Sequence, residues 1–129
     1  MSGLLLRRVD DGAVVCPRLA LGESFRQRFM GLMGRASIDD DEGLFLPTSS
    51  IHMMFMRFPI DALFVSDPDA EGIRRVVGTR EQLPPWRGIV MPVRDARGVV
   101  ELPAGTLGRH GVVRDDHVVF EAVDGVSGA

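Results

Sequence analysis

The chain has 129 residues, 45% of them hydrophobic and 26% charged, with a formal net charge of -3. This length fits one domain with one hydrophobic core, so we predict a single domain over residues 1–129. The acidic balance argues against a nucleic-acid partner, which requires a basic patch, and no apolar run approaches the roughly 18–20 residues that cross a membrane. Arg7 and Arg8 follow the first apolar run, the reverse of a signal peptide, so we expect a cytoplasmic protein without a membrane partner.

Two short apolar runs, residues 3–9 and 13–16, lie on either side of the Asp-Asp-Gly turn at 10–12 and predict a hairpin. The second run ends at Cys16, the only cysteine, which excludes an intramolecular disulfide. We interpret Cys16 as a small buried hydrophobic residue, since no neighbour supplies the electropositive setting that a cysteine nucleophile needs.

A helix is predicted next. Ser24 and Gln27 have the spacing of a capping box, in which each side chain satisfies a backbone amide at the start of a helix. The apolar residues of this segment recur every four positions, at Phe25, Phe29 and Met33. This spacing places them on one face of a short helix, which Gly34 is positioned to end.

The rest of the chain consists of short apolar runs separated by glycine and proline. The runs that we predict to be strands are residues 43–46, 51–56, 60–65, 73–77, 98–102 and 117–123. Pro59 marks a bend between two of them, because proline cannot donate a ladder hydrogen bond. One helical turn is predicted at Pro103. This pattern predicts a mainly β protein, a compact antiparallel β-sandwich or partly open barrel, with one short helix and one or two helical turns.

Four segments of the chain resemble one family. They are residues 28–35 (RFMGLMGR), 51–61 (IHMMFMRFPID), 85–87 (PWR) and 101–105 (ELPAG). In content and order they resemble the DUF192 family, also named uncharacterised protein family 0127, over about residues 19–120. The resemblance implies a compact, mostly β domain of jelly-roll character, in a family that has no settled activity and includes exported proteins.

One turn departs from the family pattern. Before the last strand the family usually has Gly-Asp, whereas this chain has Asp115 and Asp116. Glycine suits a positive φ, which aspartate tolerates less well. We therefore expect this turn to differ from that of relatives, without a change of fold.

Alternate residues of a strand share a face, so a strand over 51–56 places His52, Met54 and Met56 on one side. An imidazole with two thioethers suits a soft ion such as Cu(I). Methionine is also an adaptable core residue, and a strand buried on both faces shows the same lack of polar alternation. Copper handling therefore stays an alternative, and we predict no metal site and no cofactor.

Arg57 and Asp61 lie on either side of the Pro59 bend. We interpret them either as an ion pair that fixes the bend or as a ligand clamp, because the arginine fork suits a carboxylate or phosphate. A loop with an exposed indole and a second cation would complete a polar-rimmed pocket. The predicted ligand-binding residues are His52, Met54, Arg57, Asp61, Trp86, Arg87 and Glu101.

No nucleophile elbow, phosphate-binding glycine loop or dinucleotide fingerprint is present in the sequence. Asp61 and Glu101 remain an alternative acid–base pair for hydrolysis. We therefore predict a non-catalytic domain that binds a small anionic or polar ligand near residues 52–61, with no catalytic residues. The sequence leaves the ligand, the oligomeric state and the biological process open.

Overall fold

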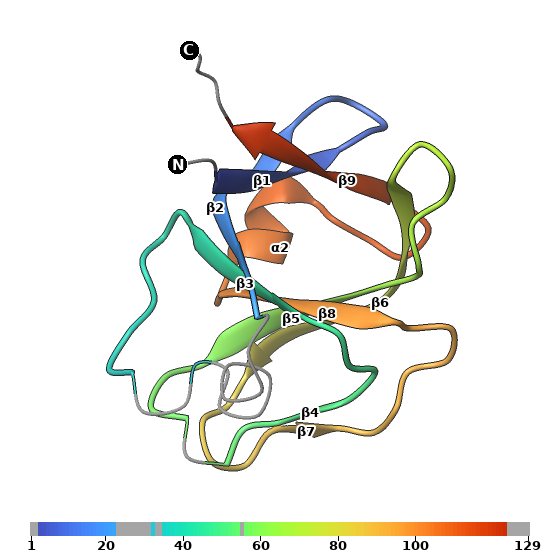
Figure 1. Cartoon of the computed structure of the whole chain (residues 1–129). Coiled ribbons are helices and arrows are strands. Elements are labelled where there is room, and N and C mark those ends of the chain that lie inside the picture. The colour runs from blue at the N-terminus through green and yellow to red at the C-terminus, as the bar shows by residue number, and fades with distance from the viewer. Residues whose placement is uncertain (1–2, 23–31, 33–34, 55, 124–129) are drawn as a thin grey trace.

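The computed structural model describes residues 3–22, 32, 35–54 and 56–123. Its strands form a barrel with a short ribbon on its outside (Figure 1). The elements are β1 (Gly3–Arg8), β2 (Val14–Leu21), β3 (Glu42–Leu46), β4 (Ile51–His52), β5 (Ile60–Val65), β6 (Ile73–Leu83), β7 (Ile89–Val90), β8 (Gly98–Pro103), α2 (Thr106–His110) and β9 (His117–Val123).

The barrel is closed, with strand order β1-β2-β3-β8-β5-β6-β9 and β1 paired to β9. Its strand pairs are antiparallel except β2 and β3, which run parallel. The prediction of a mainly β fold is confirmed, and the sheet closes completely instead of remaining partly open. Closure removes the free edges that an open sheet would expose.

Two hydrophobic cores lie on opposite faces of the same strands. Leu63 and Val100 point into the barrel, where Leu107 of α2 joins them. Ala62, Phe64 and the other residues on the outer face belong to a second core. Strands β5 and β8 are therefore buried on both faces at every residue, which explains why their sequences lack polar alternation.

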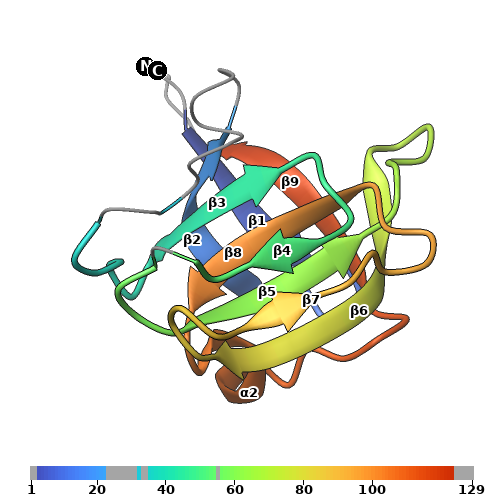
Figure 2. The same ribbon diagram turned by 90° about the horizontal axis from the view of Figure 1, so that it is seen from below.

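The second core is covered by a two-stranded ribbon of β4 and β7, which we call the outer ribbon. Its inward residues are Ile51 and Val90, and with Met53, which directly follows β4, they pack against the outside of the barrel. In Figure 2 the outer ribbon lies in front of β5 and β8. The ribbon is thus a cover held by side-chain packing, outside the closed ladder of the barrel.

The predicted strand over residues 51–56 is wrong beyond His52. The chain turns at Met54, and the N–H of Met56 donates to the C=O of Met53 at 3.0 Å. The partner of Ile51 is Val90, so β4 does not continue into the barrel with β5. The chain must bend between His52 and Ile60 because β4 belongs to the outer ribbon and β5 belongs to the barrel.

The predicted hairpin is present as β1 with β2, and the predicted strands 60–65 and 73–77 also pair with each other, as β5 with β6. The predicted helix over residues 24–34 lies outside the described residues. The predicted turn at Pro103 begins later: Pro103 is the last residue of β8, and Gly105 caps α2 with a φ of 94°. Such a positive φ is readily adopted only by glycine. None of the described helices is long and apolar enough to cross a membrane.

Candidate functional site

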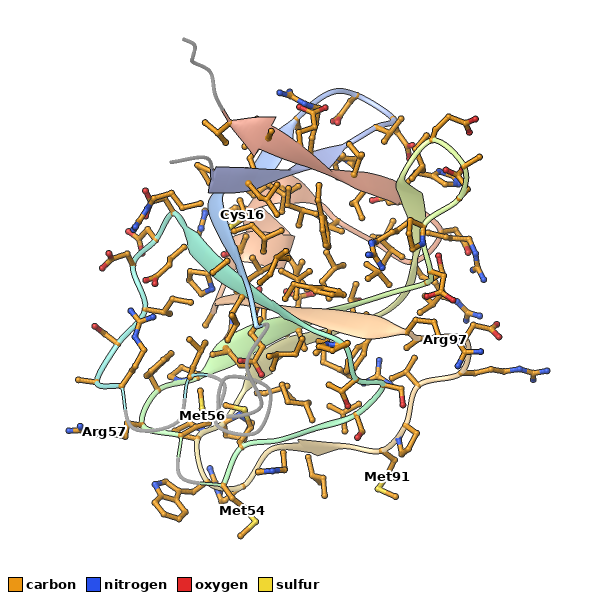
Figure 3. All side chains as sticks on the ribbon, in the orientation of Figure 1. Cys16, Met54, Met56, Arg57, Met91 and Arg97 are labelled. Carbon is orange, nitrogen blue, oxygen red and sulfur yellow. The ribbon has the colours of Figure 1, made fainter. Side chains whose placement is uncertain are left out.

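The predicted soft-metal residues do not share one face. His52 is exposed and pairs with Ile89, and the side chain of Met54 is half exposed. Met56 is buried in the core beneath the outer ribbon, because the turn at Met54 reverses the alternation. Figure 3 shows Met54 on the outside and Met56 on the inner side. Within the described residues, no group of three or more His, Cys, Asp or Glu side chains is placed to hold a metal ion.

Asp61 is completely buried, and its carboxylate accepts three backbone N–H groups. The donors are Gln82 at 2.8 Å, Gly105 at 3.1 Å and Leu107 at 2.9 Å. A buried carboxylate is stabilised when several backbone N–H groups donate hydrogen bonds to its oxygen atoms. Asp61 therefore fixes the irregular end of β6 and the start of α2 to β5, which is a structural role.

Arg57 is exposed, and Figure 3 shows it projecting away from the barrel. Among the residues that the structure describes, no ion pair joins it to Asp61. The predicted ion pair across the Pro59 bend is therefore wrong, and so is a clamp built from both side chains. The reason is that Asp61 points into the barrel while Arg57 faces solvent.

Glu101 is buried on the outer face of β8, directly opposite Ala62 of β5. Its Oε1 has no hydrogen-bond partner in the described part of the chain. Burial disfavours the charged form and raises the pKa of this carboxyl to about 7. Asp61 faces Leu102 instead, so the two carboxyl groups lie on opposite faces of the sheet and cannot share a substrate.

Trp86 and Arg87 belong to the loop that leads into β7, and both are exposed. The N–H of Trp86 donates to the C=O of Met53 at 2.8 Å, and Trp86 has a φ of 67°. At Gly88 a Cβ would lie 2.7 Å from Cγ of Met53, so this close approach requires glycine. The loop and the outer ribbon thus bring His52, Met54, Trp86 and Arg87 to one end of the molecule, while Asp61 and Glu101 lie buried inside it.

A concave surface that the sequence did not predict lies beside the outer ribbon. It has a volume of about 640 Å³ and is lined by residues 77–80 of β6, residues 89–94 and Arg114. We call it the β6–β7 groove. Ligand pockets typically occupy about 300–1,000 Å³, so its size is sufficient for a small molecule.

Three arginines line this groove: Arg80, Arg94 and Arg114. No aspartate or glutamate is among the residues that line it. Arg80 donates to the C=O of Thr79 at 2.8 Å, whereas Arg94 and Arg114 have no ion pair within the described ranges. The groove therefore concentrates positive charge in a protein whose net charge is negative.

Sequence reasoning missed the groove because its arginines come from three separate segments and form no motif. One local signal was present. Gly78 interrupts a strand, and a Cβ there would lie 3.1 Å from Cγ1 of Val93. A glycine inside a strand often marks the close approach of another segment, here the segment that forms the opposite wall of the groove.

The cysteine of the chain is shielded. Cys16 is buried, and burial raises the pKa of its thiol to about 11. This thiol is therefore protonated at neutral pH and is not an activated nucleophile. The interpretation of Cys16 as a packing residue is confirmed.

Two solved structures share this fold. A protein from Sinorhizobium meliloti 1021, named as a candidate transcription regulator, is 24% identical with a TM-score of 0.75, over 95% of this chain and 94% of that one. A protein of unknown function from Novosphingobium aromaticivorans DSM 12444 is 22% identical with a TM-score of 0.72, over 90% of this chain and 82% of that one. No curated protein matches the sequence. The model of the DUF192 family, described as uncharacterized ACR, matches residues 7–120, and the chain belongs to this family.

Proposed function

We propose that this protein is a non-catalytic binding domain that takes a small anionic ligand in the β6–β7 groove. The observation that carries the proposal is the convergence of Arg80, Arg94 and Arg114 on one groove without a lining carboxylate. The proposed site thus lies beside the outer ribbon, and no residue of the Pro59 bend lines it. The class of ligand is the one that the sequence predicts.

The chemistry of arginine supports an anion. Its planar guanidinium donates two parallel hydrogen bonds to a carboxylate or phosphate. Several of the described arginines outside the groove already have such partners, for example Arg18 with Asp41 at 2.7 Å and Arg35 with Glu42 at 2.8 Å. Arg94 and Arg114 lack an equivalent partner within the described residues, so their donors are available to a ligand.

The placement of the carboxyl groups supports a role without catalysis. Asp61 is occupied by three backbone amides, and Glu101 is enclosed on the other face of the sheet. A general acid or base must come within hydrogen-bond reach of its substrate. Hydrolysis therefore has no support from these two residues.

Copper handling and nucleic-acid binding have less support than anion binding. Copper handling loses Met56 to the core, which leaves His52 and Met54 as exposed donors. The regulator named among the similar structures suggests a nucleic-acid partner, but a net charge of -3 disfavours nucleic acid as the ligand. We therefore keep a small anion as the proposed ligand.

The proposal is tested by titrating the isotope-labelled protein with citrate and with inorganic phosphate. The chemical shifts of the backbone amides, measured by NMR, report where each anion binds. We expect shifts at residues 77–80 and 89–94, and about tenfold weaker binding in Arg94→Gln or Arg114→Gln, because a lost charged hydrogen bond costs roughly 1.5–3 kcal/mol. Arg57→Gln is the matched control, since it removes the same charge from an exposed site outside the groove. Weakening by Arg57→Gln but not by the groove variants would return the site to the Pro59 bend.

A further inference from the structure

The outer ribbon exposes an apolar face beside the groove. Ile89 is 67% exposed, Met91 is 71% exposed and Met54 is 51% exposed. Figure 3 shows Met54 and Met91 on the outer side of the ribbon. Exposed apolar side chains next to cations are typical of a surface that binds another molecule. The groove and this face share Ile89 and Met91.

The outer ribbon also has an unpaired edge. It contains only β4 and β7, so in the described structure the second edge of β7 has no strand partner. The C=O of Gly88 accepts from Met53, which means that Gly88 directs its main chain toward β4. Because main-chain groups alternate in direction along a strand, Ile89 directs its N–H and C=O away from β4. The groove, which β7 lines and β4 does not, lies on that side.

We propose that the anion bound in the β6–β7 groove is an extended acidic segment of another protein, which adds as a strand to the free edge of β7. This inference rests on the proposed function and specifies its ligand. Main-chain hydrogen bonds to β7 would supply affinity, and alternate side chains would supply specificity, as in other cases of strand addition. Carboxylates of the segment would meet the groove arginines, and its apolar side chains would pack on Ile89 and Met91.

Charge complementarity selects this occupant. Arg80, Arg94 and Arg114 line the groove, and Arg87 lies in the loop that leads into β7. A second copy docked symmetrically by this same surface would bring these cations against their own equivalents, which is repulsive. An acidic segment satisfies the cations and the strand edge together.

A capped hexapeptide of alternating aspartate and leucine is a suitable probe, and the fluorescence of Trp86, the single tryptophan, supplies the readout. We expect saturable binding that citrate competes away. Binding should weaken about tenfold or more in Arg94→Gln or Arg114→Gln, and equally when asparagine replaces aspartate in the peptide. A peptide N-methylated at the alternate amides that face β7 should also bind at least about tenfold more weakly, because it cannot form a ladder, whereas methylation of the other alternate set should be tolerated. The protein itself is unchanged in that comparison.

The outcomes separate the two proposals. If citrate binds in the groove but the peptide does not, or if N-methylation weakens binding on neither of the two alternate sets of amides, strand addition is wrong and the anion site stands. If neither citrate nor the peptide binds, both proposals fall. A third outcome is that the protein sediments with vesicles of phosphatidylserine and phosphatidylcholine but does not bind the peptide. That result would assign the apolar face to a lipid surface and overturn the inference.

Discussion

Glu101 is the residue at which burial and ionisation conflict most directly. Its carboxyl is buried on the outer face of β8, and its pKa is raised from 4.5 to about 7. The folded protein therefore holds a proton that the unfolded chain releases at lower pH. The contribution of Glu101 to the free energy of unfolding is therefore greatest below about pH 4.5. It falls as the pH rises toward 7 and then levels off.

We expect the pH dependence from Glu101 to reach about 3 kcal/mol, since one pKa unit corresponds to about 1.4 kcal/mol. Glu101→Gln should remove this dependence, because the amide has a similar shape and does not ionise. Urea unfolding at pH 5 and pH 8 measures the effect, with the exposed Glu71→Gln as the matched control. An unchanged pH profile in Glu101→Gln would show that the carboxyl is charged in the folded state.

Asp115 shows what the departure from the family pattern means. This residue has a φ of 77°, the left-handed conformation that glycine adopts without cost. Its carboxylate lies 3.0 Å from Arg75, an exposed ion pair worth about 0–1 kcal/mol. The sequence correctly identified the position of conformational strain, while the compensating arginine lies 40 residues away and left no local sign.

Asp115→Gly should relieve the strained conformation and stabilise the protein by up to about 1 kcal/mol, partly offset by the lost ion pair. Asp115→Asn separates the two effects, because asparagine tolerates the same φ but carries no charge. We expect thermal unfolding to rank Gly above Asn at this position. If Asn is equal to or better than Gly, backbone strain is not the controlling cost; the comparison of Asn with the native Asp measures the ion pair.

At the scale of elements, local patterns were sufficient for the hairpins but not for the outer ribbon. The pairs β1–β2 and β5–β6 are close in sequence and are marked by turn residues. The pairing of Ile51 with Val90 depends on a tertiary contact that no local pattern encodes. The donors to Asp61 are likewise 21, 44 and 46 residues away, so a structural carboxylate resembled a functional one.

Gly88 tests how the loop before β7 is fixed to the outer ribbon. An added Cβ would meet Cγ of Met53 at 2.7 Å and the C=O of Pro84 at 3.0 Å. Because the backbone contact cannot give way easily, Gly88→Ala should destabilise the protein by about 1–3 kcal/mol and shift the emission of Trp86. Gly3→Ala is the control, since nothing lies within 4 Å of its added Cβ. Equal stability of the two variants would mean that the loop is not held closely.

At the scale of the whole molecule, the fold class followed from composition and strand length, whereas the closure of the barrel did not. Short apolar runs with frequent turns are compatible with both a sandwich and a barrel. Closure depends on the pairing of β1 with β9 at opposite ends of the chain. It leaves the outer ribbon outside the ladder of the barrel, and the ladder of the ribbon itself has two residues in each strand.

This division predicts two levels of opening. Leu63 and Val100 lie in central strands with partners on both sides. Met53 and Val93 lie next to the outer ribbon, where the N–H of Met53 donates to Gly88 and the N–H of Val93 donates to Ser49. We expect the amides of Met53 and Val93 to exchange with solvent through an opening that costs at least about 2 kcal/mol less than that of the barrel. Native-state hydrogen exchange, followed residue by residue, measures both. Separate opening would let the ribbon adjust to a ligand while the barrel stays closed, and equal protection at all four amides would mean that ribbon and barrel form one cooperative unit.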